Sequence, residues 1–251
     1  MGSWNKKDGS VSINFSNPCL IGIGALQTMK RIAGVDDAGR GPIIGPLVIA
    51  GVMIIEEQAK DLLTIGVKDS KLLSPQMRTR LASKIRELAL RINLIEAQPR
   101  EIDEIVLHGE RLRKLNFLEA KMMAEVITHL SPSEVYVDAS DVDEERYGET
   151  IREFLPTELK SVRVISKHHA DRTYAVVSAA SIIAKVRRDE AVEALRGEFG
   201  DFGSGYVTDP KTVKFLRAWR RKHAEYPPIV RLSWKTIKEI EREIGQVRLG
   251  A

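Results

Sequence analysis

Four aspartates in this chain have the residue type and the placement that a metal site needs. Asp36 and Asp37 stand side by side where an apolar, β-rich run meets a glycine-rich turn. Asp138 ends the short apolar run 134–138, and Asp171 precedes a long helical stretch. If these carboxylates converge, they repel one another unless a cation neutralises them. Oxygen-only ligands suit Mg²⁺ or Mn²⁺, so the set predicts metal-assisted phosphodiester hydrolysis.

Each acid also has a plainer interpretation. An isolated Asp-Asp-x-Gly is usually a solvated turn, Asp138 could be a turn former, and Asp171 could cap a helix. Neighbouring strand side chains point to opposite faces, so Asp36 and Asp37 serve one site only if the strand is already ending there. The nearby glycines let the backbone come close to a ligand. The metal site therefore requires that the four acids converge.

An α/β pattern places these acids. The sequence predicts strands over 31–36, 43–55, 91–97, 134–138 and 161–166. It predicts helices over 74–89, 100–130 with a break near Gly109, 143–155, 172–198, 210–223 and 235–246. Early strands, then alternating helices and strands, then a helical tail indicate an α/β fold with a mixed sheet.

Composition sets broad limits on this interpretation. The chain has 251 residues, 43% of them hydrophobic, which is enough for a sizeable core. Lys and Arg outnumber Asp and Glu by 39 to 35, and this net charge of +4 is compatible with a polyanionic partner. A single cysteine, Cys19, excludes an intrachain disulfide and favours a reducing, cytoplasmic compartment. The longest apolar run, 43–55, is too short to cross a membrane.

The sequence predicts that the chain divides into three parts. Residues 1–28 differ in composition from the rest, and we expect a disordered extension or a misassigned start before Met29. Residues 29–200 carry the four acids, and residues 201–251 form a helical C-terminal region.

Several segments in order resemble type 2 ribonuclease H (ribonuclease HII) in its archaeal form. They are GVDDAGRGPIIGPLVIAGV, KDSKLLS, VYVDASD, HHADRTYAVVSAASIIAKVRRD, GSGYVTDPKT and PPIVRLSWKTIKEI, and together they span about residues 31–240. The resemblance implies a ribonuclease H-like fold with a five-stranded mixed sheet flanked by helices, and a C-terminal region that helps to hold substrate. It implies an endonuclease that cuts the RNA strand of RNA–DNA hybrids and cuts at ribonucleotides embedded in duplex DNA.

The resemblance also assigns roles to residues. It makes Asp36, Asp37, Asp138 and Asp171 both catalytic residues and ligands of two divalent ions, Mg²⁺ or Mn²⁺. The turn Gly39-Arg40-Gly41 then reads the ribose 2′-hydroxyl, and Tyr206 stacks on the sugar after the cut. Polar residues near the phosphates are Lys68, Ser70 and Lys185, although Lys185 could equally lie on a solvated helix face. The products carry 5′-phosphate and 3′-hydroxyl ends, and the protein is expected to act as a monomer.

Three further features need a separate interpretation. The family usually has Asp-Glu where this chain has Asp36-Asp37, so the second carboxylate is one methylene shorter. On the predicted helix 210–223, Lys214 and Arg217 belong to a basic stripe with an apolar back, a shape expected of a phosphate-contacting helix or of an ordinary solvated face. His168 and His169 near Asp171 are interpreted as strand-end residues and not as zinc ligands.

Two rival functions remain open at this stage. One is another nuclease of the same fold, such as a junction resolvase or integrase, which would lack the Gly-Arg-Gly turn and Tyr206. The other is a hybrid-binding protein without catalysis, silenced by the change at Asp37. Turnover of a duplex with one embedded ribonucleotide would separate the second from an active enzyme.

Overall fold

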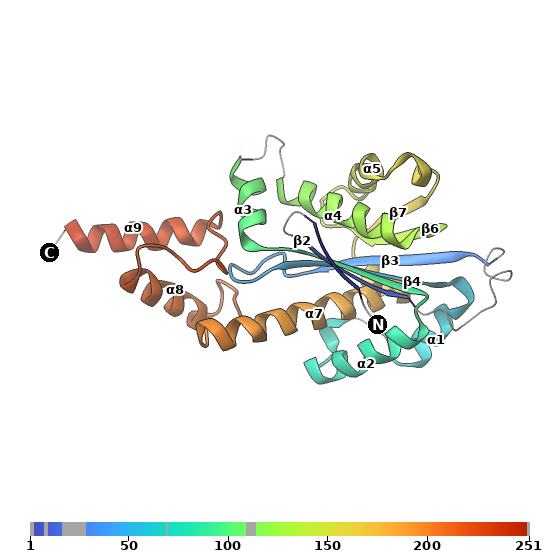
Figure 1. The fold of residues 1–251 in the computed structure, drawn as a ribbon, viewed down its shortest axis with the longest axis horizontal. Coiled ribbons are helices and arrows are strands. Elements are labelled where there is room, and N and C mark those ends of the chain that lie inside the picture. Colours follow the sequence, from blue (N-terminus) through green and yellow to red (C-terminus); the bar gives the residue numbers. More distant parts are fainter. Residues whose placement is uncertain (1–2, 8–9, 17–28, 69, 109–113, 250–251) are drawn as a thin grey trace.

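A mixed seven-stranded sheet forms the centre of the molecule (Figure 1). The computed structural model describes residues 3–7, 10–16, 29–68, 70–108 and 114–249. The strands are β1 (Ser3–Lys7), β2 (Ser10–Ser16), β3 (Arg31–Ala38), β4 (Leu47–Ile55), β5 (Arg91–Ala97), β6 (Glu134–Asp138) and β7 (Arg163–Lys167), in the order β1-β2-β5-β4-β3-β6-β7. β6 and β7 run parallel to β3, whereas the other neighbours pair antiparallel.

Helices cover both faces of this sheet and extend it at one end (Figure 1). They are α1 (Ala59–Thr64), α2 (Pro75–Leu88), α3 (Pro99–His108), α4 (Lys114–Leu130), α5 (Glu144–Phe154), α6 (Ala170–Thr173), α7 (Ala175–Phe199), α8 (Pro210–Lys222) and α9 (Lys235–Leu249), with short 3₁₀ turns at Glu56–Gln58, Ser70–Leu72 and Thr157–Leu159. The Ser74 side chain accepts a hydrogen bond from the Met77 amide, and Pro75 is the first residue of α2, as the sequence predicts.

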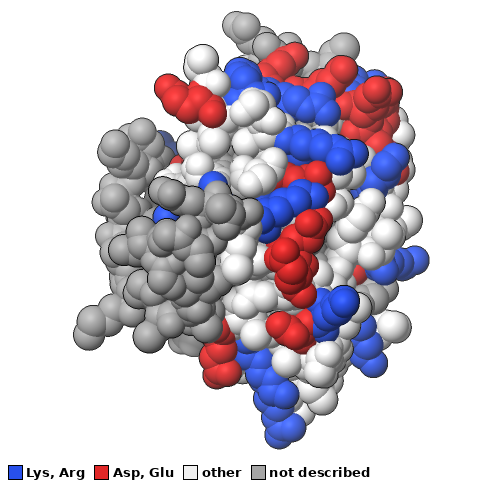
Figure 2. Space-filling view, turned by 90° about the vertical axis from the view of Figure 1, so that its right-hand side faces the viewer, with Lys and Arg blue, Asp and Glu red and all other residues white. Residues whose placement is uncertain are grey.

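Charges of both signs lie at the end of the sheet that is farthest from α8 and α9. Figure 2 shows Lys and Arg interspersed with Asp and Glu on this end of the molecule. Ion pairs such as Lys30–Glu56 (2.8 Å) and Arg163–Glu134 (3.2 Å) connect neighbouring strands there. A surface of mixed sign does not favour a polyanion, so the opposite ends of β3 and β6 are the better place to look for a nucleic-acid site.

Strand β3 and helix α7 approach each other so closely at Gly34 that backbone meets backbone. An added Cβ at Gly34 would lie 2.3 Å from the Val176 carbonyl carbon, so only glycine fits there. The small residues Ala179, Ala180 and Ala184 of α7 are fully buried in the same cluster. This contact fixes α7 along the central strand that carries Asp36.

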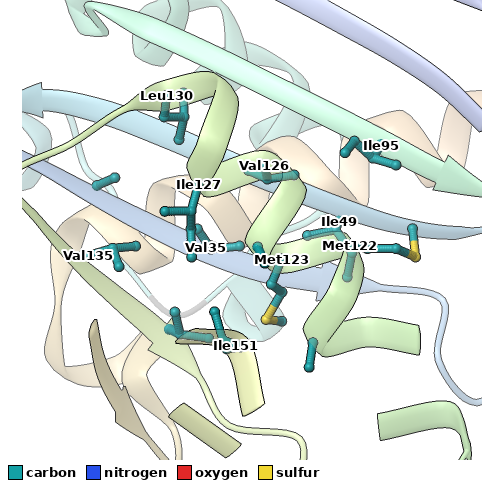
Figure 3. Close-up of a cluster of buried hydrophobic side chains, with 14 of the residues drawn as sticks. Val35, Ile49, Ile95, Met122, Met123, Val126, Ile127, Leu130, Val135 and Ile151 are labelled. Atoms are coloured by element: carbon teal, nitrogen blue, oxygen red, sulfur yellow. The ribbon is translucent and has the colours of Figure 1, made fainter. Parts of the chain in front are cut away.

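The other face of the sheet packs against α4. Val35, Ile49 and Val135 of the sheet meet Met123 and Ile127 of α4 in one buried cluster (Figure 3). A third cluster joins the C-terminal region to the loop between β3 and β4, with Ile43 and Ile44 packed among buried side chains of Phe202, Leu216, Ile229, Val230, Ile237 and Ile240. Both strand faces and the loop after β3 are therefore held by separate cores.

The observed fold confirms the predicted ribonuclease H-like α/β architecture and adds to it. The five strands β5-β4-β3-β6-β7 are the expected mixed sheet. The predicted strand 43–55 begins later, at Leu47, because Gly45 (φ +93°) and Pro46 interrupt it. Residues 3–7 and 10–16 differ from the expected disordered extension, since they form two paired strands, and the second of them, β2, pairs with β5. The rest of segment 1–28, apart from those strands, lies outside the described residues.

None of the helices in the described part of the chain combines the length and apolar character that a membrane crossing needs.

Gly34→Ala is expected to lower the free energy of unfolding by about 1–3 kcal/mol, because α7 must move away from the added methyl group. Gly197→Ala on α7 is the matched control, since nothing lies within 4 Å of its added Cβ. The control should be neutral or stabilising, because alanine is the better helix former. Chemical denaturation of both variants checks this, and equal stabilities would contradict the close contact.

Candidate active site

A cleft of about 510 Å³ lies where β3 and β6 end. All four predicted acids line it, although they come from three separate segments. The lining also includes most of the other residues selected from the sequence: Gly39, Arg40, Gly41, Lys185 and Tyr206. The cleft therefore brings together the acids and the glycine-rich turn that the sequence predicts to act together.

Asp36 and Asp37 both lie within β3, which continues to Ala38. The strand ends one residue after Asp37, which is what the sequence requires if both acids are to serve one site. They pair with Ala50 and Ile49 of β4 in regular register, and their side chains therefore alternate between the two faces of the sheet. Both nevertheless line the cleft, because the cleft lies at the end of the sheet and is open to both faces.

The Asp36 carboxyl group is buried on the α7 side. Burial, together with the charges of Asp37 and Asp138, raises its pKa to about 8, although the Lys185 ammonium group opposes the shift. Lys185 Nζ also donates to Ser181 Oγ at 2.7 Å, and Ser181 Oγ lies 2.8 Å from Ser70 Oγ. On this face of β3, the buried Asp36 carboxyl group therefore has one cation, Lys185, and the hydroxyl groups of Ser181 and Ser70 nearby.

Asp37 lies towards the other face, near the buried Glu119 of α4. Burial and the charge of Asp37 raise the pKa of Glu119 to about 8, whereas Arg40 lowers it. The Arg40 guanidinium group donates to Glu119 and, at 2.7 Å, to Asn116 Oδ1. Helix α4 therefore holds the side chain of the turn residue that follows the two acids.

Asp138 and Asp171 are brought together by the start of α6. Asp138 Oδ1 accepts a hydrogen bond from the Ala170 amide at 2.8 Å, which ties the end of β6 to this helix. His169 has a left-handed backbone (φ 56°) that turns the chain into α6, and the next residue but one is the buried Asp171. The Ser178 hydroxyl donates to the Asp171 carbonyl and connects α6 to α7.

The chemistry of this donor set fits a hard divalent cation. The cleft presents carboxylate oxygens and no thiol or imidazole among its lining residues. Mutual repulsion contributes to the raised pKa of Asp36, and a bound cation would relieve it. In the described residues no group of three or more His, Cys, Asp or Glu side chains has already converged on a metal position. The carboxylates therefore share one cleft without forming a ready-made set of three metal ligands in the described residues.

The turn 39–41 is shaped by its backbone. Gly39 has φ +92°, and an added Cβ there would lie 2.5 Å from the Pro46 carbonyl oxygen. The Tyr206 ring lies next to Gly41, within 3.5 Å of where a Cβ would be. Arg188 of α7 lies over the Tyr206 ring, 5.3 Å from its centroid. The turn and the tyrosine are thus neighbours in space, as the predicted roles require.

Four of the predicted residues lie away from the cleft. Lys68 is exposed and Ser70 is buried behind Ser181. Lys214 and Arg217 line a separate groove of about 430 Å³ on α8, with the apolar side chains of Val207, Val213 and Ala218. Arg217 is engaged there by Glu243 at 2.9–3.0 Å. His168 lies in a third cleft, beside Glu144, so the structure gives it no place near the acids.

Sequence reasoning missed several polar residues of the cleft. Arg78, Arg188 and Asp189 line it, and Arg78 Nη2 donates to Asp189 Oδ2 at 2.9 Å. A signal was present for two of them, because Arg188 and Asp189 follow Lys185 by three and four residues and so share its helix face. No local pattern identifies Glu119, whose role depends on how α4 crosses the sheet.

Comparisons with known proteins found a matching family model and several similar proteins. The family model described as Ribonuclease HII matches residues 33–237. A curated ribonuclease HII of Methanosarcina barkeri is 46% identical over 219 residues, which cover 85% of this chain and 96% of that protein. The crystal structure of ribonuclease H2 from Pyrococcus horikoshii is 42% identical with a TM-score of 0.77, covering 85% of this chain and 98% of that one. The Archaeoglobus fulgidus ribonuclease HII, solved as a complex with PCNA, is 40% identical with a TM-score of 0.73 and coverage of 83% and 96%.

Asp36→Asn is expected to stabilise the metal-free protein, and to do so more at pH 8 than at pH 5. The folded-state pKa of about 8 lies above the ordinary 3.8, so the folded protein binds this proton more tightly than the unfolded chain. Stability therefore falls as the pH rises from about 4 to about 8, and asparagine removes that loss.

Chemical denaturation with a chelator present checks this prediction, and the gain at pH 8 should exceed the gain at pH 5 by at least about 1 kcal/mol. Asp61→Asn, at an exposed position of α1, is the control and should show no such difference. A gain independent of pH would show that burial of the Asp36 charge does not destabilise the fold.

Proposed function

Since this chain belongs to the ribonuclease HII family, we propose that the cleft at the ends of β3 and β6 is where it hydrolyses the RNA strand of RNA–DNA hybrids. The family makes the chain a metal-dependent endoribonuclease. One observation carries the assignment of the site: four acids from three segments line a single cleft together with the turn 39–41 and Tyr206.

The carboxylates of Asp36, Asp37, Asp138 and Asp171 would hold two divalent ions, Mg²⁺ or Mn²⁺. When bound, such ions activate water and stabilise the departing 3′-oxygen, which leaves 5′-phosphate and 3′-hydroxyl ends. The chain's own contribution is to position the acids: β3 presents two of them, and the Ala170 amide fixes Asp138. Asp37, one methylene shorter than the usual glutamate, remains close to the cleft because β3 itself reaches the cleft.

The turn 39–41 and Tyr206 would recognise the substrate. Backbone groups of the turn read the ribose 2′-hydroxyl, which is the group that separates RNA from DNA. The half-exposed Tyr206 ring lies beside Gly41 and offers a face on which a sugar can stack. This arrangement suits a single ribonucleotide embedded in duplex DNA, where the strand changes from a ribonucleotide to a deoxyribonucleotide.

Cations on both sides of the acids would contact phosphates. Lys185, Arg78 and Arg188 line the cleft itself. Lys214 on α8 lies in the neighbouring groove and is the better candidate there, because Arg217 already pairs with Glu243. We propose that the duplex runs from the cleft towards α8, with phosphates neutralised along this path.

The rival functions fit the cleft less well. A resolvase or integrase of this fold would need neither the turn 39–41 nor Tyr206, yet both lie at the acids. A silent hybrid-binding protein would need Asp37 to be displaced from the site, whereas Asp37 lines it. Turnover in Mg²⁺ or Mn²⁺ decides between binding alone and catalysis.

We propose that the protein acts as a monomer in the cytoplasm, on RNA–DNA hybrids and on duplex DNA containing ribonucleotides. The relative from Archaeoglobus fulgidus was solved with PCNA, so PCNA is the first protein partner to test by gel filtration of the mixture.

Asp138→Asn is expected to abolish cleavage of a duplex with one embedded ribonucleotide while preserving the fold and hybrid binding. Asparagine keeps an oxygen that can accept the Ala170 hydrogen bond but loses the charge that holds a cation. The measurement is cleavage in Mg²⁺ and in Mn²⁺, with an all-DNA duplex as the control substrate. Near-normal turnover of the variant, or cleavage of the all-DNA duplex by the wild-type protein, would refute the assignment.

Lys214→Ala is expected to flatten the salt dependence of hybrid binding by about one unit in the log–log slope, because one phosphate contact and its released counterions are lost. Lys60→Ala is the matched control, since Lys60 is an exposed lysine of α1, which lies at the opposite end of the molecule from α8 (Figure 1). Equal slopes for the two variants would show that Lys214 only faces solvent.

A further inference from the structure

All three carbonyl groups of the turn 39–41 accept hydrogen bonds from one short segment near the C-terminus. Arg231 Nη2 donates to the Gly39 oxygen at 2.6 Å, and Arg231 Nη1 donates to the Arg40 oxygen at 3.0 Å. Trp234 Nε1 donates to the Gly41 oxygen at 3.1 Å. The segment 231–234 therefore fixes the orientation of three consecutive peptide groups.

The arginine of this segment is an unusual residue to bury. Arg231 is fully buried, and burial lowers its pKa to about 9. In the part of the chain that the structure describes, its hydrogen-bond acceptors are backbone carbonyls, including Gly45 at 2.9 and 3.0 Å, and its guanidinium group lies over the Trp234 ring. Burying a cation against neutral carbonyls is costly, but these hydrogen bonds satisfy backbone carbonyls that would otherwise be buried without a partner.

The segment is itself anchored from two directions. The Asp103 carboxylate of α3 accepts hydrogen bonds from the Leu232 amide (2.7 Å) and the Ser233 amide (2.8 Å). The Arg231 amide donates to the Ile43 carbonyl at 2.9 Å. The donors of Arg231 and Trp234 are therefore held in place before any substrate arrives.

Fixed carbonyls determine where the amide groups of the turn point. The described chain has no cis peptide bond, so in each peptide group the N–H points away from the carbonyl oxygen. With the Gly39 and Arg40 oxygens held by Arg231, the amides of Arg40 and Gly41 point away from the segment 231–234. The side chain of Arg40 is held independently, by Glu119 and Asn116.

We propose that Arg231 and Trp234 are positioning residues that orient the turn for recognition of the ribose 2′-hydroxyl, so that ribonucleotide selectivity depends on a segment that does not touch the acids. The proposal rests on the proposed role of the turn 39–41. It predicts that loosening the segment weakens binding of a ribonucleotide-containing duplex while leaving the affinity for plain DNA unchanged.

Trp234→Phe tests this, because it removes one N–H donor and keeps an aromatic ring against the same apolar side chains. The dissociation constants of a duplex with one ribonucleotide and of the same all-DNA duplex are measured with Mg²⁺ in an Asp138→Asn background, where cleavage is blocked. The preference for the ribonucleotide is expected to fall about threefold to tenfold, the size of one hydrogen bond. Trp219→Phe is the control, since that indole donates to the Glu225 carbonyl at 3.1 Å, away from the turn, and should leave the preference unchanged.

Arg231→Gln should reduce the preference further, with Arg196→Gln as its control because Arg196 binds the Gly203 carbonyl at 2.6 and 3.2 Å. If Arg231→Gln fails to fold, Trp234→Phe still decides. A normal preference in the parent that Trp234→Phe leaves unchanged, or equal losses for both duplexes, would overturn the positioning role alone. A parent without any preference would overturn the ribose-reading role of the turn and this proposal with it.

Discussion

Adjacent side chains of a β-strand point to opposite faces of the sheet, and this constraint governs how the site is built. Asp36 and Asp37 lie in the regular part of β3, so neither helix layer can serve both. Helix α7 provides Lys185 and Ser181 for one carboxylate, and α4 provides Glu119 beside the other. The cleft has to lie at the end of the strand, because only there do the two faces meet.

This arrangement makes the metal-free site costly. The Asp36 carboxyl group is buried beside two other carboxylates, and its pKa rises to about 8, so folding works against its ionisation near neutral pH. Two nearby groups favour the ionised form of Asp36. They are the Lys185 ammonium group and the Asp37 amide, which donates to Asp36 Oδ1 at 2.8 Å. Because the rest of the fold tolerates this cost through its two large cores, a cation that binds only the folded form would stabilise the protein by mass action.

The sequence predicts local features well and misses those that arise from contacts between distant segments. The strand 91–97 and the start of α2 follow from alternation and from Ser74-Pro75, which are local signals. The alternating Val11, Ile13 and Phe15 also had strand periodicity, yet composition alone led to the expectation of a disordered extension. The four acids could be selected through their motifs. Glu119 and Arg231 could not, because their importance comes from burial against a turn 79 and about 190 residues away in sequence.

The C-terminal region is connected to catalysis through the loop between β3 and β4. Its core contains Ile43 and Ile44, and Ile44 forms a bridge with Val230. The same loop carries the turn 39–41 directly after Asp36 and Asp37, so a displacement of the C-terminal region would be transmitted to the end of β3. Tyr206 and the groove on α8 belong to this region as well. The elements proposed to contact substrate therefore share one apolar cluster. A boundary at residue 200 divides the sequence more sharply than it divides the packing.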